Sequence, residues 1–227
     1  MNISEDILRF NLQNVYFLVG TACGGKTTMA AALAQKYGFT HFNDNYHEEN
    51  FAHWQSICDE RHKNSPDNTQ SQSQGYDWER HFNRPPEEYN DSLEQGYKEY
   101  FEYAIIELIK YAQQNTVVAD IGLSGLTCEL VKQLAPPDRI ACLLAPPELI
   151  AEDYFDRDDH RDIYEAIMRL KEPEMALENM KNVFRFGAQR TIDDVKSSGL
   201  YYIMRTKTST VASTQRALER HFGLENY

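Results

Sequence analysis

The stretch "VYFLVGTACGGKTTMAAALAQKYG", residues 15–38, decides the fold of this chain. Its first five residues are all apolar or aromatic, which is typical of a short buried strand. A glycine-rich loop follows, and a run of strong helix formers then continues to Gly38, which is expected to stop the helix. We therefore expect a strand, a tight loop and a helix in immediate succession.

The loop fits the pattern G-x-x-x-x-G-K-[ST], with Gly20, Gly25, Lys26 and Thr27 at the fixed positions. Glycines let the backbone wrap closely around a phosphate chain, and the N-terminus of the following helix attracts the same anion. Lys26 would reach the β- and γ-phosphates, and the Thr27 hydroxyl would bind Mg²⁺. The alternative is a tight turn that merely contains a lysine. The expected nucleoside triphosphate site comprises Gly20, Thr21, Ala22, Cys23, Gly24, Gly25, Lys26, Thr27 and Thr28.

Four more apolar segments resemble buried strands, and each precedes turn residues and a helical pattern. This alternation predicts an α/β fold in which crossover helices connect the strands of a parallel five-stranded sheet. The expected strands cover residues 15–19, 39–43, 116–120, 139–144 and 200–204.

Two connections are too long for simple crossovers, and both belong to a single domain of residues 1–227. The pattern of residues 47–114 predicts a helical insertion that binds a substrate. A long amphipathic helix is expected in its second half. The helical pattern of residues 147–198 predicts a lid and further helices.

Composition narrows the class of protein. The 227 residues carry a formal net charge of −12, which argues against a nucleic-acid-binding surface. The four cysteines form no C-x-x-C pair, so no disulfide or structural metal framework is predicted. The chain begins without a signal-peptide pattern, and its apolar runs are too short to cross a bilayer. We expect a soluble cytoplasmic protein without membrane contact, and the sequence gives no indication of its oligomeric state.

The order of these elements, together with the phosphate-loop motif, resembles the small-molecule kinases of the P-loop NTPase superfamily. That group includes nucleoside and nucleotide kinases, shikimate- and gluconate-type kinases and antibiotic phosphotransferases. The tetrapeptide N-K-x-D that reads the base in switch GTPases does not occur here. The resemblance implies a three-layer P-loop NTPase fold that binds ATP and Mg²⁺. It also implies transfer of the γ-phosphoryl group to a small-molecule hydroxyl.

The same resemblance assigns expected roles at the strand ends. Asp44 follows the second strand, where a carboxylate would orient the acceptor hydroxyl, although it fits a turn residue equally well. Asp120 ends the third strand like a Walker B aspartate and would lie near Mg²⁺. Gly122, in the loop that follows, would border the substrate. Arg205 follows the fifth strand, where this group often packs the adenine ring.

Three further arginines have expected roles. Arg157 and Arg161 are spaced i,i+4, which would place both on one helical face of a lid that closes over the transferring phosphoryl group. The surrounding acidic residues make a solvated, ion-paired helix the alternative. Arg84 would grip a carboxylate or phosphate of the substrate, or instead act as a cap or pair with an acidic neighbour. Tyr97 is one of several aromatic residues of the insertion that would line the acceptor pocket or, alternatively, belong to the core.

Two other functions remain open. A nucleoside monophosphate kinase needs several arginines in its insertion, and this one offers only Arg61, Arg80 and Arg84, which favours a hydroxyl acceptor. A nucleotide-binding regulatory protein with slow ATPase activity would instead use the insertion, including the polar tract "NTQSQSQ", to contact a protein partner.

Overall fold

Five parallel strands form the centre of the molecule. The computed structural model describes residues 4–43, 56, 77–122, 127–157 and 160–226. The sheet order is β2-β3-β1-β4-β5, so the strand that leads into the phosphate loop lies in the middle. The predicted parallel five-stranded sheet is therefore confirmed. The strands are β1 (Val15–Gly20), β2 (Thr40–Asn43), β3 (Val117–Gly122), β4 (Ile140–Leu144) and β5 (Tyr201–Met204).

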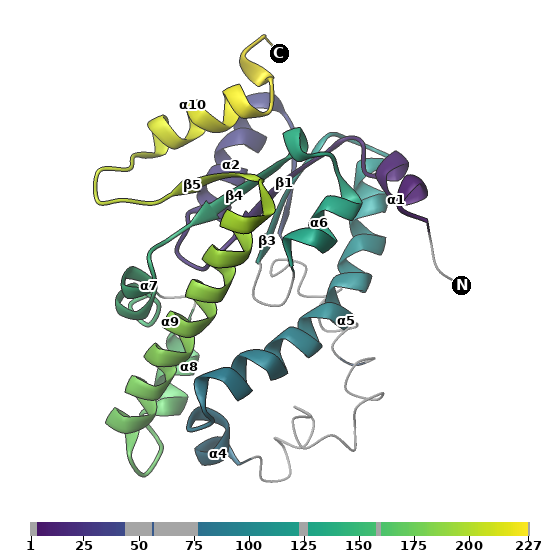
Figure 1. Cartoon of the computed structure of the whole chain (residues 1–227). Helices are drawn as coiled ribbons and strands as arrows, with labels where there is room; N and C mark the ends of the chain where they lie inside the picture. Colours follow the sequence, from purple (N-terminus) through teal and green to yellow (C-terminus); the bar gives the residue numbers. More distant parts are fainter. Residues whose placement is uncertain (1–3, 44–55, 57–76, 123–126, 158–159, 227) are drawn as a thin grey trace.

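Helices cover both faces of the sheet, which gives three layers (Figure 1). Along β1, Tyr16 and Leu18 face one hydrophobic cluster, whereas Val15, Phe17 and Val19 face the other. This alternation follows from the two-residue period of a strand. The first cluster is covered by α2 (Lys26–Tyr37) and α10 (Val211–His221). The second is covered by α5 (Pro86–Ala112), α6 (Cys128–Leu134) and α9 (Pro173–Ser198), and α1 (Glu5–Asn11) packs beside α6.

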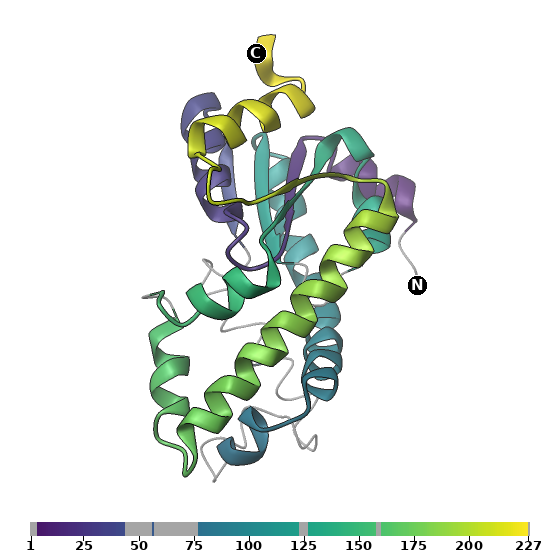
Figure 2. The ribbon, with the colours of Figure 1, turned by 60° about the vertical axis from the view of Figure 1, so that its left-hand side comes forward.

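Helices α5 and α9 extend well beyond the sheet, as both views show (Figures 1 and 2). Their far ends pack with α4 (Trp78–Phe82) and α8 (Arg161–Ile167) around a separate hydrophobic cluster. Helix α7 (Pro147–Asp153) follows β4 and packs on α9. Residues 147–198 contain α7, α8 and α9. Of the expected insertion 47–114, α4 and α5 are described, whereas residues 47–55 and 57–76 lie outside the described part of the chain.

Local signals explain where the helices begin and end. Gly38 ends α2 with φ +70°, a left-handed conformation that glycine adopts without strain. Prolines start α5, α7 and α9, because the first turn of a helix needs no N–H from them. Thr210 and Ser213 cap α10 reciprocally through side chain and backbone. None of the described helices is both long and apolar enough to cross a membrane.

Candidate functional site

The phosphate loop lies directly against β4. Gly20 has φ +136°, and a Cβ atom there would lie 2.1 Å from the carbonyl oxygen of Leu143. A Cβ atom on Gly24 would lie 2.4 Å from the same oxygen, so both positions require glycine. The Thr21 amide donates to that carbonyl at 3.2 Å, and the Thr21 hydroxyl accepts from the Ala145 amide at 2.8 Å. These contacts hold the first half of the loop in a single conformation.

The second half of the loop has the backbone of an anion cradle. Cys23 and Gly25 both have positive φ, +55° and +90°, on either side of Gly24. An alternation of this kind turns successive N–H groups towards one side. Gly25 is the N-cap that precedes α2, and a Cβ atom there would meet open space. The Lys26 Nζ donates to the Thr21 carbonyl at 3.0 Å. The loop therefore fits a chain of phosphates at the N-terminus of a helix.

A single cavity of about 1210 Å³ opens in front of this loop. Its lining includes the loop, the ends of β2 and β3, and residues of α5 and α9. Small-molecule pockets commonly measure roughly 300–1000 Å³, so this cavity is larger than a typical pocket for one small molecule. The expected residues that line it are Thr21, Ala22, Cys23, Gly25, Lys26, Thr27, Thr28, Asp120, Gly122, Arg157 and Arg205.

Asp120 provides a buried carboxylate at this cavity, with 3% of the residue exposed. It lies opposite Asn43 in the β2–β3 pair, and the Asn43 amide donates to its Oδ2 at 2.9 Å. The Nε2 of His41, 3.9 Å from the same oxygen, has no hydrogen-bond partner among the described residues. Asn43 was not predicted as a site residue, because the sequence does not reveal that the second and third strands are neighbours.

The oxygens of Asp120 and Thr27 line the same cavity and suit Mg²⁺. The described residues contain no cluster of three or more His, Cys, Asp or Glu side chains that would hold a metal by itself. Such a pair of protein oxygens is what Mg²⁺ needs when phosphate oxygens and water complete its shell. Asp44, the other expected acidic residue, lies outside the described part of the chain.

The two expected lid arginines do not share a helical face, and that prediction is wrong. Helix α7 ends at Asp153 and α8 begins at Arg161, so Arg157 lies in the connection between them. Arg157 lines the cavity and hydrogen-bonds the Cys23 thiol. Arg161 is not among the cavity-lining residues; its side chain is 74% exposed and lies 3.5 Å from Glu165. The alternative of a solvated ion pair holds for Arg161.

Cys23 is not acidified by its place near the start of α2. Burial raises the pKa of its thiol, and the nearby Arg157 and Arg205 offset this effect only in part. Arg205 also donates to the Cys23 carbonyl at 2.8 Å, and its own amide donates to the Leu144 carbonyl at 2.7 Å. Arg205 therefore joins the end of β5 to the phosphate loop.

Arg84 lies behind the cavity wall instead of in it. Only 8% of the residue is exposed, and its guanidinium contacts His81 Nδ1 at 2.8 Å and lies 5.1 Å from the Tyr89 ring centre. Its carbonyl accepts from the Asn179 amide at 2.8 Å. Arg84 therefore does not face the cavity, and its partner is His81 instead of the acidic neighbour that the alternative expected.

The sequence did not single out the aromatic wall of the cavity, apart from Tyr97. Tyr89 and Tyr97 come from α5, Phe184 comes from α9, and Tyr154 follows α7. These positions fall in three segments that are far apart in the chain, so no local pattern unites them. Arg190, on α9, also lines this side.

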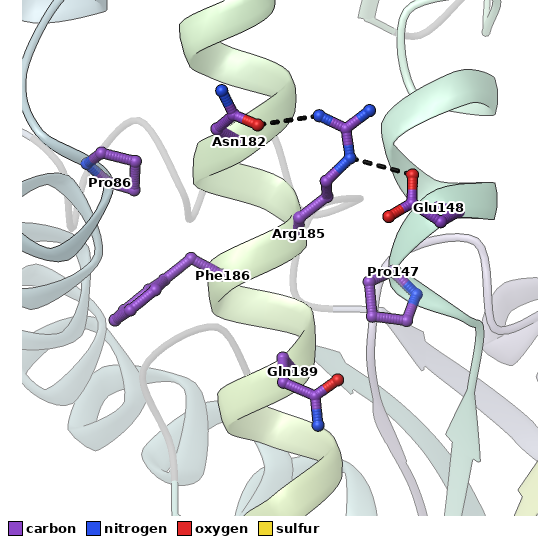
Figure 3. Close-up of a pocket in the computed structure, with 7 residues that line it drawn as sticks. All are labelled: Pro86, Pro147, Glu148, Asn182, Arg185, Phe186 and Gln189. Atoms are coloured by element: carbon purple, nitrogen blue, oxygen red, sulfur yellow. Dashed lines mark hydrogen bonds and ion pairs between the residues drawn. The ribbon is translucent and has the colours of Figure 1, made fainter.

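A smaller hollow of about 630 Å³ lies on another face of α9 (Figure 3). Arg185 crosses it and donates to Glu148 at 3.0 Å and to Asn182 at 2.8 Å. Phe186 and Gln189 complete the α9 side, and none of the expected site residues lines it. The large cavity therefore remains the candidate site.

Comparisons with known proteins show a likeness in architecture and none in sequence. No family model matches the chain, and no curated protein matches its sequence. Among solved structures, the chain is similar to a shikimate kinase from Acinetobacter baumannii in complex with shikimate. The TM-score is 0.49 and the sequence identity 17%, over 94% of this chain and 95% of the other. At that identity the comparison concerns the course of the backbone and does not extend to the residues of the site.

Proposed function

We propose that this protein is an ATP-dependent kinase that transfers the γ-phosphoryl group of Mg-ATP to the hydroxyl of a small molecule. One observation carries the proposal: the cavity that holds the phosphate loop continues without interruption to the aromatic wall on α5 and α9. A second molecule therefore has room beside the triphosphate, which a protein that only binds nucleotide does not need.

The loop side of the cavity would bind the triphosphate. Lys26, Arg157 and Arg205 supply positive charge there, and the loop amides supply hydrogen-bond donors. Thr27 and Asp120 would hold Mg²⁺, which neutralises charge on the phosphates when bound. Asn43 fixes the orientation of the Asp120 carboxylate. Gly122 lines the cavity where β3 ends, beside the acceptor's expected position.

The reaction exchanges one phosphorus–oxygen bond for another. The acceptor oxygen would bond to the γ-phosphorus while the bond to the β,γ-bridging oxygen breaks, and ADP would leave with that electron pair. The hydroxyl proton would pass to a carboxylate or to water. Asp44 is the candidate carboxylate, on the strength of its place directly after β2.

Replacing Lys26 tests the nucleotide half of the proposal. We expect Lys26→Ala to weaken Mg-ATP binding about tenfold or more, because a charge-assisted contact to phosphate is lost. Isothermal titration calorimetry measures the affinity, and Lys110→Ala, which removes a lysine that is 61% exposed on α5, is the matched control. Unchanged affinity and turnover in Lys26→Ala would contradict the proposal.

Acceptor dependence tests the kinase half. ADP production should rise when a metabolite mixture is added to the protein with Mg-ATP, because hydroxyl acceptors are then present. A rate of ATP hydrolysis that is unchanged by the mixture but increases with a protein partner would favour the regulatory alternative instead.

A further inference from the structure

Two stacked rings close the connection between α7 and α8. Tyr154 directly follows α7, and His160 directly precedes α8. The centres of the two rings lie 4.1 Å apart, and their planes differ by only 7°. Aromatic pairs at this spacing attract each other beyond the area that they bury. The stack therefore holds together the points where the chain leaves one helix and enters the next.

Tyr154 is anchored to the rest of the molecule. Its ring centre lies 4.0 Å from that of Phe184 on α9. Both residues pack with Ala22 and Cys23 of the phosphate loop around one small buried cluster. The Tyr154 amide also donates to the Ile150 carbonyl at 3.0 Å, which continues the bonding of α7. His160 thus stacks on a ring that α7, α9 and the phosphate loop already hold in place.

Arg157 lies midway between the two stacked residues in the chain. Its carbonyl accepts from the His160 amide at 3.1 Å. Its side chain lines the cavity and hydrogen-bonds the Cys23 thiol. The residue belongs to neither α7 nor α8, so helical geometry does not fix its direction. A long side chain on such a connection keeps one direction only if the connection itself is held.

Arg161 shows what happens to an arginine just beyond the stack. It begins α8, its side chain is 74% exposed, and its guanidinium lies 3.5 Å from Glu165. The His160 side chain does not cap α8. Replacement of the His160 ring therefore removes the stack without removing a helix cap.

We infer that Tyr154 and His160 are positioning residues, whose stacked rings hold Arg157 over the phosphate loop. From there Arg157 would contact the transferring phosphoryl group, and its direction would be set before the nucleotide binds. The role of Arg157 in this inference rests on the proposed kinase function. The positioning itself concerns the protein without nucleotide and is tested separately.

The first experiment uses the Cys23 thiol to report where Arg157 lies, without nucleotide. Arg157 lowers the pKa of that thiol, so Arg157→Ala should move the midpoint of iodoacetamide alkylation to higher pH. In a His160→Ala background, Arg157→Ala should move the midpoint less than about half as far, because Arg157 is no longer held there. The comparison within one background cancels any change in Cys23 burial that loss of the His160 ring causes. Peptide mass spectrometry measures the alkylation of Cys23.

His160→Phe is the matched control, because it keeps a flat ring on Tyr154. In that background Arg157→Ala should move the midpoint as far as in the unmodified protein. His160→Leu keeps an apolar side chain without a flat ring, and it gives the same reading should His160→Ala not fold. A full shift in the His160→Ala or His160→Leu background would overturn the inference. Absence of a shift in the unmodified protein would overturn it as well.

The second experiment compares Mg-ADP with Mg-ADP and aluminium fluoride, which mimics the transferring phosphoryl group. Calorimetry should show tighter binding with fluoride, and Arg157→Ala should remove most of this gain. His160→Ala should reduce the gain about three- to tenfold, and His160→Phe should restore it. The affinity for Mg-ADP alone should stay within about twofold in His160→Ala, because ADP lacks the group that Arg157 contacts.

Each result of the second experiment has one meaning. Failure of Mg-ADP to bind would count against the kinase function, whereas the alkylation series decides the positioning without nucleotide. If Mg-ADP binds, a fluoride-dependent gain that is absent, or that Arg157→Ala and His160→Ala leave unchanged, would overturn the inference. An equal loss of affinity for Mg-ADP alone in His160→Ala would show a general structural effect and would also overturn it.

Discussion

Cys23 occupies a left-handed bend of the phosphate loop, with φ +55°, a conformation that is uncommon outside glycine. Two arginines contact this one residue: Arg157 at the thiol and Arg205 at the carbonyl oxygen. Through them, the connection after α7 and the end of β5 both touch the loop. A single residue therefore joins three segments that are distant in the chain.

The raised pKa of Cys23 makes a prediction about its reactivity. Because the thiolate is the reactive form, alkylation by iodoacetamide should increase with pH through a midpoint above that of the same residue in the unfolded chain. Arg157→Ala should move the midpoint higher still, since Arg157 stabilises the thiolate. Peptide mass spectrometry across a pH series measures the reaction, and protein in guanidinium chloride provides the reference. A folded midpoint below that reference would contradict the raised pKa.

Among single residues, those that belong to a contiguous sequence motif could be predicted from the sequence. The phosphate loop is a short contiguous motif, and two of its glycines, Gly20 and Gly24, are required by close contacts with Leu143. The Asn43–Asp120 contact and the burial of Arg84 depend on which elements pack together. Those neighbours are set by the tertiary fold, which one sequence does not display.

Helices α5 and α9 meet at a close contact between Asn90 and Gly187, both of which line the cavity. A Cβ atom on Gly187 would lie 2.3 Å from the Asn90 side-chain oxygen. That side chain cannot easily move, because its amide donates to the Pro86 carbonyl at 2.7 Å and to the Val183 carbonyl at 3.1 Å. The absence of a side chain at position 187 therefore sets how closely the two walls approach.

Substitution of Gly187 should have opposite effects in two backgrounds. Gly187→Ala alone should lower the free energy of unfolding by about 1 kcal/mol, because overpacking outweighs the gain in helix propensity. In an Asn90→Ala background the clash is gone, and Gly187→Ala should raise the free energy of unfolding by about 1 kcal/mol. Urea denaturation of the four proteins measures both steps, and an effect of the same sign in both would be inconsistent with this contact.

Elements with a strong periodic pattern were predicted well, whereas the break between α7 and α8 was not predicted. The strands follow from runs of apolar residues, and the long α5 helix follows from apolar residues at helical spacing. The region around Arg157 contains many helix-compatible residues, yet the chain leaves the helix after Asp153 and resumes it at Arg161. There, Tyr154 and Phe155 both pack against Phe184 of α9, so tertiary contacts override local propensity.

The whole molecule contains a sheet region and a helical end with separate hydrophobic cores. Two clusters sandwich the sheet, and a third lies among α4, α5, α8 and α9 beyond it. Ile167, which is fully buried, and Met180 belong to this third cluster. The helical end therefore depends on packing that the sheet does not share, although α5 and α9 run through both.

Loss of packing at Ile167 should loosen the helical end before it affects the sheet. Ile167→Ala removes buried apolar volume, a change that costs about 2–4 kcal/mol where it acts. Hydrogen–deuterium exchange should therefore become faster in α8 and the first half of α9, and remain unchanged in β1 and β3.

A substitution that shortens a side chain in the core next to the sheet provides the comparison. Leu108→Ala, in the cluster between α5 and the sheet, should accelerate exchange throughout the molecule. Equal acceleration of β1 and β3 by Ile167→Ala would show that the two regions unfold as one unit.

Helix α9 passes through every part of this arrangement. Its 26 residues span about 39 Å, from the helical end, past the aromatic wall, to the core under the sheet. At Gly199, with φ +74°, the chain turns directly into β5, and Arg205 then reaches the Cys23 carbonyl. Helix α9 and β5 thus connect the aromatic wall of the cavity to the phosphate loop. In the proposed kinase, a tilt of α9 on binding of the acceptor would alter the affinity for the nucleotide, and the reverse effect would be equally large.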